Sequence, residues 1–322
     1  MNYSNRKCPI CASEKKEFLE FLINKIDNKD FFYVICKTCG MMYLDSSYHH
    51  DKIQDIYDHT YWEEPENISM LTRMFARGVG IIENFISYGH TPKKILDIGG
   101  GIGGVANGMR SINNAEITIL DRSLSARKQS EKFGFDTIDS ISKLGENINK
   151  YDTIVMCQSL EHFVDPIGLI NSIKTFLKKD IHLYIEVPNA KWHPSNEIFH
   201  ETMWTKSLLS NLSELLCSGE KKIWSSSKPF KGVRPIYLHL IGRINSNNVQ
   251  LNHQIYKNFS SSKFSRKIFY LFSLYSKVIE KIPSYRLRRY FNPYKNKGVQ
   301  NFELYTKNVN NLLKIHDLSS ND

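Results

Sequence analysis

Short apolar runs alternate with amphipathic stretches over residues 93–244. The runs have the length of strands, and the stretches between them place apolar residues at helical spacing. Predicted strands cover residues 95–98, 117–120, 135–138, 151–156, 181–187 and 236–241. Strands that alternate with helices predict an α/β fold, a mostly parallel sheet with helices on both faces. Ligands of such folds bind at the carboxyl ends of the strands.

Helix boundaries support this alternation. Ser123 is a predicted cap for the helix after the second strand. Asp165 followed by Pro166 predicts another helix start, because proline suits the first helical position. A further helix is predicted over residues 205–217, ending near Gly219.

Glycines fill the turn after the first predicted strand. A tight turn from strand to helix, or a ligand against the backbone, requires residues without a Cβ atom. Gly99, Gly101 and Gly104 fit G-x-G-x-x-G, a fingerprint of dinucleotide-binding proteins. Asp97, Gly99, Gly101 and Gly103 also fit a second pattern, D-x-G-x-G-x-G. The glycines alone do not decide between these patterns, or exclude a turn that binds nothing.

Polar residues follow the predicted strands at the edge where a ligand is expected. Asp97 ends the first strand, and Asp121 ends the second, where a carboxylate can accept hydrogen bonds from both ribose hydroxyls. Asp139 and Ser140 follow the third strand and are candidates for holding an adenine amino group. Gln158 follows the fourth. The alternative for each is an ordinary polar residue at a strand end.

Four of the six cysteines form two C-x-x-C pairs, Cys8 with Cys11 and Cys36 with Cys39. This spacing lets each pair direct two thiolates at one tetrahedral zinc ion. A strand is predicted between the pairs, over residues 31–35. The pattern predicts a zinc ribbon whose ion is structural, whereas a redox dithiol would need one pair only.

Composition is that of an ordinary globular protein, with 41% hydrophobic and 24% charged residues among 322. No apolar run has the length of a membrane span, and residues 1–6 lack the apolar core of a signal peptide. We therefore expect a cytoplasmic protein. The net charge of +10 belongs mainly to residues 245–322, which contain 13 Lys and Arg against 4 Asp and Glu.

The basic C-terminal stretch carries aromatic and aliphatic residues at helical spacing between residues 260 and 297. A basic amphipathic helix of this kind can lie on an anionic membrane, which would place the protein at the inner membrane face. The same features could bind a phosphate-bearing substrate or RNA. A helix packed on the main domain, with a solvated basic face, is the remaining alternative.

Four segments are predicted along the chain. Residues 1–47 form the zinc-ribbon module, and residues 48–92 form a helical connector. The α/β domain covers residues 93–244, and residues 245–322 form a basic, aromatic, helical tail.

The chain resembles class I S-adenosylmethionine-dependent methyltransferases, and among them the sugar methyltransferases that carry an N-terminal zinc-binding module. The resemblance is carried, in this order, by the cysteine pairs and by residues 95–104, 160–166, 186–189 and 199–204. It implies a Rossmann-like methyltransferase fold with a seven-stranded sheet. It also implies S-adenosylmethionine as the cofactor, bound by the glycine turn and the acid Asp121, rather than a nicotinamide dinucleotide.

One segment departs from the pattern of this group. Sugar C-methyltransferases have Tyr-His-Glu-His after the fifth strand, whereas this chain has Phe199, His200, Glu201 and Thr202. The last substitution removes the imidazole that the group would use as a base. We therefore expect methylation of oxygen rather than carbon, with His200 and Glu201 as base or substrate orienter and His162 as a third candidate.

The expected function is methylation of a sugar, linked to a nucleotide or lipid, in surface polysaccharide or glycan biosynthesis. An RNA methyltransferase is one alternative, in which the ribbon and the basic tail bind phosphates. A non-catalytic protein that has kept the cofactor-binding fold is the other.

Overall fold

The computed structural model describes residues 6–26, 29–45, 68–190, 199–227 and 235–246, together with Lys307. All structural statements below concern these residues. The stretch 260–297, with its predicted membrane contact, lies outside them, as do residues 48–67 of the predicted connector.

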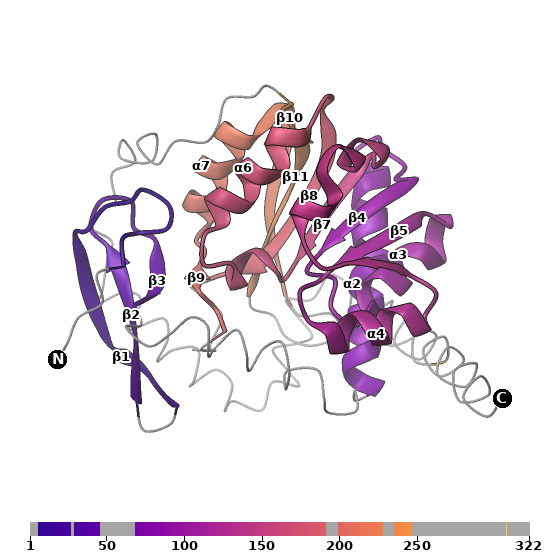
Figure 1. The fold of residues 1–322 in the computed structure, drawn as a ribbon. Helices are drawn as coiled ribbons and strands as arrows, with labels where there is room; N and C mark the ends of the chain where they lie inside the picture. Colours follow the sequence, from indigo (N-terminus) through magenta and orange to yellow (C-terminus); the bar gives the residue numbers. More distant parts are fainter. Residues whose placement is uncertain are drawn as a thin grey trace, which may run out of the picture.

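A seven-stranded mixed sheet forms the centre of the α/β unit, in the order β10-β11-β8-β7-β4-β5-β6 (Figure 1). The five strands from β8 to β6 run parallel, whereas β11 is antiparallel to both β8 and β10. The strands are β4 (Lys94–Ile98), β5 (Glu116–Leu120), β6 (Asp136–Ile138), β7 (Thr153–Cys157), β8 (Ile181–Pro188), β10 (Cys217–Ser226) and β11 (Tyr237–Ile244). The predicted α/β class and its six strands are confirmed.

The strand order reverses next to β4. The chain continues from β4 to β5 and β6 on one side, then returns to β7 and β8 on the other. In open α/β sheets such a switch point leaves a crevice at the carboxyl ends of the two diverging strands. The glycine turn leaves β4 at this point.

Helices cover both faces of the sheet (Figure 1). They are α2 (Ile68–Ser87), α3 (Gly104–Asn113), α4 (Leu124–Lys132), α5 (Ile141–Leu144), α6 (Pro166–Phe176) and α7 (Lys206–Leu216), with 3₁₀ turns η1 (Gly145–Lys150) and η2 (Leu160–His162). The predicted caps are present: Ser123 Oγ accepts from the Ala126 amide, and Asp165 accepts from the Gly168 amide. None of the helices in these described ranges is long and apolar enough to cross a membrane.

The two faces of the seven-stranded sheet belong to two different hydrophobic clusters. Ile95 packs with residues of α2 and α3, whereas its neighbour Leu96 joins the cluster that contains α6 and α7. The contact between α2 and α3 is unusually close, because a Cβ atom on Gly78 would lie 2.0 Å from the Val105 carbonyl oxygen. A Cβ atom on Gly108 would lie 2.0 Å from the Phe75 carbonyl oxygen. The two glycines let the helix backbones touch.

A second sheet lies beside the first, in the order β1-β2-β3-β9 (Figure 1). Its strands are β1 (Lys16–Ile26), β2 (Lys29–Cys36), β3 (Met42–Asp45) and β9 (Thr202–Met203). The first three belong to the cysteine-containing segment, but β9 comes from the chain after β8. The four cysteines of the pairs also share one hydrophobic cluster with Leu208 and Trp204. The N-terminal segment is therefore packed directly onto the α/β unit.

The helix predicted over residues 205–217 is confirmed as α7, with Thr205 as its N-cap and Cys217 as its C-cap. Strand β10, which begins at Cys217, was not predicted. Most side chains of β10 are partly or fully exposed, so the strand lacks the apolar run that identifies a buried strand. Gly219 has a φ of 67° but lies inside the strand, where the pairing with β11 shifts register.

Candidate active site at the carboxyl edge of the sheet

The glycine turn joins β4 to α3 in left-handed backbone conformations. Gly99, Gly101 and Gly103 have φ values of 73°, 56° and 82°. A Cβ atom on Gly99 would lie 2.4 Å from the Cβ atom of Ser159, so this turn touches the segment that follows β7. The predicted glycines thus line the switch point, and the amides at the start of α3 face the same edge.

Asp121 ends β5 and binds the turn. Its carboxylate accepts hydrogen bonds from the Gly101 and Ser123 amides, both at 2.9 Å, and the residue is buried. Asp121 therefore holds the turn in place from the end of β5, and its predicted contact with the ribose hydroxyls stays a prediction.

Asp97 lies below the same turn and is 1% exposed. Its Oδ2 has no hydrogen-bond partner among the described residues and would lie 2.7 Å from a Cβ atom on Gly100. Burial, with a smaller contribution from the charge of Asp121, raises the pKa of Asp97 to about 7. A buried carboxyl group of this kind is suited to an incoming ammonium group. The amino-acid end of S-adenosylmethionine carries one, so the donor set fits the predicted cofactor.

Gln158 follows β7 with a φ of 54° and is fixed by Glu186 of β8. Its Nε2 donates to Glu186 Oε1 at 3.1 Å, and its backbone amide donates to the Glu186 carbonyl at 2.8 Å. Arg77 of α2 forms an ion pair with the same carboxylate at 2.8 Å. Tyr184 donates to it at 3.2 Å, and His239 Nδ1 lies 3.4 Å from it. Arg77 was not predicted from the sequence, although a charged residue within the apolar pattern of α2 was a signal for it.

Asp139 and Ser140 follow β6 at the same edge. Asp139 pairs with Lys143 at 2.5 Å, and this contact lowers the pKa of Asp139. Ser140 Oγ donates to Asp139 at 3.1 Å. Both side chains thus form contacts at the start of α5. Their contact with adenine stays a prediction.

The structure brings His162 and His200 together. Their ring centroids lie 5.0 Å apart, in an edge-to-face arrangement. His162 Nδ1 lies 2.8 Å from the Phe199 carbonyl oxygen, and His162 Nε2 lies 4.0 Å from Glu161 Oε1. Burial lowers the pKa of His162 to about 4, so the ring is neutral at physiological pH.

Glu201 is fully buried and pairs with Arg6 at 2.7 Å. Thr202 accepts a hydrogen bond from Trp204 Nε1 at 3.1 Å. Neither Arg6 nor Glu161 was predicted from the sequence to have a role. Arg6 had no local signal, because its partner lies 195 positions away.

The cysteine cluster fits a tetrahedral metal ion. Its four sulfurs are buried and lie within 4.8 Å of one another. Cys8 Sγ lies 3.5 Å from Cys39 Sγ, and Cys11 Sγ lies 3.5 Å from Cys36 Sγ. A zinc ion with Zn–S bonds of about 2.3 Å requires sulfur separations of about 3.8 Å, so small side-chain rotations suffice.

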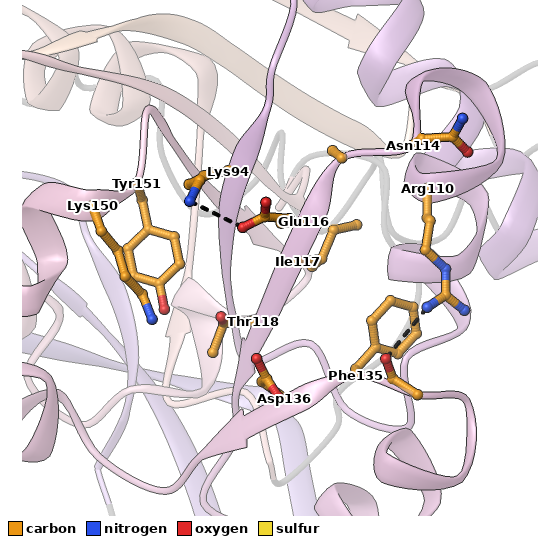
Figure 2. A pocket seen from close by; sticks show the side chains of 12 residues that line it. Lys94, Arg110, Asn114, Glu116, Ile117, Thr118, Phe135, Asp136, Lys150 and Tyr151 are labelled. Carbon is orange, nitrogen blue, oxygen red and sulfur yellow. Dashed lines mark hydrogen bonds and ion pairs between the residues drawn. The ribbon is translucent and has the colours of Figure 1, made fainter.

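A cavity of about 450 Å³ lies at the opposite edge of the sheet (Figure 2). Lys94 and Glu116, which begin β4 and β5, form an ion pair there at 3.1 Å. Arg110, Lys150 and Tyr151 also line it. Because it lies at the amino ends of the strands, it is separate from the cofactor turn.

Comparisons with known proteins agree with this geometry. Residues 70–228 match the family model described as a methyltransferase domain. A ubiquinone biosynthesis O-methyltransferase of Actinobacillus pleuropneumoniae serotype 7 (strain AP76) is 34% identical over 110 residues, 30% of this chain and 46% of the relative. The protein of the same name from Marinobacter nauticus (strain ATCC 700491 / DSM 11845 / VT8) is 25% identical over 117 residues, 33% of this chain and 48% of the relative. The chain thus spans about half the length of the curated relatives it matches.

One solved structure similar to this chain is the plantazolicin methyltransferase BpumL in complex with a triazolic desmethylPZN analog and SAH. It is 20% identical, and the match covers 60% of this chain and 90% of that chain with a TM-score of 0.43.

The strand order, the left-handed glycine turn, the acid that binds it and the family match define one class of domain. The chain carries a class I, S-adenosylmethionine-dependent methyltransferase domain. The predicted fold class and cofactor are thereby confirmed.

Proposed function

We propose that this protein methylates a hydroxyl group of a sugar, carried on a nucleotide or a lipid, in surface polysaccharide or glycan biosynthesis. The observation that carries the proposal is the position of the histidine cluster beside the cofactor turn. Ser159 lies against Gly99, and Glu161 and His162 follow in the same segment. His200 packs on His162 from the segment before β9.

Bound S-adenosylmethionine supplies a methyl group on a sulfonium, which a positioned nucleophile displaces. The residues of the chain then need to orient one substrate oxygen and assist the loss of its proton. His162 and His200 are the groups that we assign to this orientation. Glu201 is assigned a structural role instead, because its carboxylate is paired with Arg6.

Oxygen is favoured over carbon as the acceptor atom. Carbon methylation requires a base strong enough to remove a proton from carbon, whereas a hydroxyl oxygen already presents a lone pair and can lose its proton late. Thr202 is fully buried, and its hydroxyl accepts a hydrogen bond from Trp204. Within the described ranges, this hydroxyl donates to the Glu161 carbonyl oxygen at 3.5 Å, rather than to the activating base that a hydroxyl needs to act as a nucleophile or base. The curated relatives, named as O-methyltransferases, support the same choice.

The sugar itself rests on the resemblance of the cysteine module and of the segments around Glu186 and His200 to sugar methyltransferases. The structure adds that this module contacts the histidine cluster, since Tyr33 donates to the His200 carbonyl oxygen at 2.7 Å. The predicted contacts of the basic tail with lipid or RNA concern residues outside the described ranges.

The test is methyl transfer from S-adenosylmethionine labelled with ¹³C in its methyl group. The acceptors are a set of nucleoside-diphosphate hexoses and deoxyhexoses, with a structured RNA transcript as a parallel acceptor. Carbon–proton correlation NMR should show a methyl bonded to oxygen on a sugar. His162→Gln should lower the rate by about 100-fold or more, whereas His182→Gln at the far end of β8 should not. Methyl transfer to RNA alone, or a carbon-linked methyl, would contradict the proposal.

A further inference from the structure

Two imidazoles and one carboxylate meet at the junction of the two sheets. Glu161 and His162 belong to η2 after β7, and His200 belongs to the segment before β9. One ligand atom of each residue lies within 4.8 Å of the others. We infer that Glu161, His162 and His200 bind a divalent transition-metal ion, in addition to the ion expected at the four cysteines.

The donor set favours a transition metal over magnesium. Imidazole nitrogens suit zinc, iron, nickel and copper, whereas magnesium prefers oxygen ligands and retains its waters. Two histidines and one carboxylate also leave open positions on the ion, as in catalytic sites. Donors on one ion lie about 3 to 3.5 Å apart when each bond is about 2.1 Å. Because His162 Nε2 and Glu161 Oε1 are 4.0 Å apart, this pair needs to approach by about 1 Å or less. The ligand atom of His200 lies within 4.8 Å of the other two, so it needs to approach by less than about 2 Å.

The orientation of His162 is the second argument. Its Nδ1 lies 2.8 Å from the Phe199 carbonyl oxygen, which can only accept a hydrogen bond. Nδ1 must therefore carry the proton, and Nε2, on the side of Glu161, carries the lone pair. Metal-binding histidines are held in this way by a carbonyl or carboxylate on the second nitrogen. The carbonyl that orients His162 belongs to the residue directly before His200.

Residues of the N-terminal segment fix the positions of the two segments that carry the proposed ligands, η2 and the residues before β9. Tyr33 donates to the His200 carbonyl oxygen, and Arg6 donates to the Val164 carbonyl oxygen at 3.0 Å. Arg6 also neutralises Glu201, the neighbour of His200. Of the two buried carboxylates in this region, Glu161 is the one within 4.8 Å of both imidazoles. The cluster thus combines one carboxylate with two imidazoles as donors for the ion.

The role of this metal site in turnover rests on the proposed function, methylation of a sugar hydroxyl. A divalent ion at this position can bind the attacking hydroxyl of the sugar together with a neighbouring hydroxyl. It lowers the pKa of that hydroxyl, as it does for water. The O–H bond then breaks with its proton passing to water, the O–CH₃ bond forms, and the S–CH₃ bond breaks with its electron pair remaining on sulfur. A metal ion would replace the base that the chain lacks at Thr202.

Binding is tested with Co²⁺ on the full-length protein whose cysteines already hold zinc. Cobalt bound by nitrogen and oxygen shows visible bands without the intense near-ultraviolet transitions of cobalt thiolates. The parent should gain such bands with one equivalent of Co²⁺. It should bind Co²⁺ in preference to Mg²⁺. His200→Gln and Glu161→Gln should each weaken binding more than tenfold. His182→Gln is the matched control, because His182 stacks on His90 with centroids 3.6 Å apart, outside the cluster.

Folding of each variant is checked by its affinity for S-adenosylmethionine, which should equal that of the parent. Absence of a Co²⁺ spectrum in the folded parent would overturn the site. Equal Co²⁺ binding by the parent, His200→Gln and Glu161→Gln would do the same. Co²⁺ binding without methyl transfer to any sugar would retain the site and contradict the proposed substrate, so the two failures are distinguishable.

Discussion

Arg6 and Glu201 form a buried ion pair, with 2.7 Å between Nη1 and Oε2 and side chains 10% and 0% exposed. The same guanidinium donates to the carbonyl oxygens of Leu44 and Val164. It therefore connects the end of β3, the segment after η2 and the segment before β9. Arg6 thus connects the N-terminal sheet to the candidate catalytic region, in addition to the β3–β9 pairing and the hydrogen bond from Tyr33 to the His200 carbonyl oxygen.

Arg6→Ala should lower the free energy of unfolding by about 3 kcal/mol, because it leaves the Glu201 carboxylate buried without its cation. Lys7→Ala is the matched control. Lys7 pairs with Glu14, but both side chains are largely exposed, so its loss should cost less than about 1 kcal/mol. Urea unfolding monitored by circular dichroism measures both. Equal effects of the two substitutions would show that the Arg6 pair has no structural role.

Two glycines of α2 should respond to alanine with opposite signs. A Cβ atom on Gly78 would meet the backbone of α3, whereas one on Gly80 would have no atom within 4 Å. Gly78→Ala should destabilise by about 1 to 3 kcal/mol through overpacking. Gly80→Ala should stabilise by about 0.5 to 1 kcal/mol, because alanine loses less backbone entropy in a helix. Thermal unfolding of the two variants checks this, and destabilisation by both would refute the close contact of α2 and α3.

Removal of the cysteine-bound metal should destabilise more than the N-terminal sheet. Cys36→Ser should release about one equivalent of zinc relative to the parent, since the four sulfurs form one cluster. Because β3 pairs with β9 and the cysteines share a cluster with Leu208, we expect the midpoint of the whole unfolding transition to fall. Metal analysis and circular dichroism measure the two effects, with Cys217→Ala as a control that keeps its zinc. An early separate transition, with the main transition unchanged, would show that the module is independent.

Asp97 should give the protein a stability that decreases with pH. Burial raises its pKa from 3.8 in a model carboxyl to about 7 in the fold. Between these values the folded chain binds more protons than the unfolded chain, so the free energy of unfolding falls as pH rises. The contribution lost by pH 7 is on the order of 4 kcal/mol. Asp97→Asn cannot titrate, and its stability should lack this decline between about pH 4 and pH 7. Parallel pH profiles of the two proteins would contradict the assignment.

Local signals in the sequence were sufficient for most of the main sheet and for the cofactor turn. The turn glycines and the cap at Ser123 are contiguous patterns whose physical cause lies within a few residues. Asp121 was found from its place at the end of a predicted strand, although its partner Gly101 lies 20 positions away. Strand β10 was missed because its side chains are mostly not buried. Strand β9 was missed because two residues show no periodicity, and it forms only because β3 lies beside it.

The residues that join distant segments could not be predicted in this way. Arg6 finds Glu201 across 195 positions, and Gly78 faces α3 only once the two helices pack. Arg77 and Glu186 meet between α2 and β8, and their pairing fixes Gln158. In each case the two partners are far apart in the sequence and meet only in the folded chain. The local sequence around one residue therefore does not identify its partner.

The central claim is that the turn after β4, together with Asp121, forms a site for S-adenosylmethionine. Calorimetric titration of the cofactor into the full-length protein tests it most directly. Asp121→Ala should weaken binding by about 1 to 3 kcal/mol, the cost of losing hydrogen bonds to a buried carboxylate. Asp136→Ala, at the start of β6 beside the opposite cavity, should bind as the parent does. We expect one S-adenosylmethionine per chain, and a loss of affinity in Asp121→Ala that Asp136→Ala does not show. Equal affinity of that variant, or a preference of the parent for a nicotinamide dinucleotide, would contradict it.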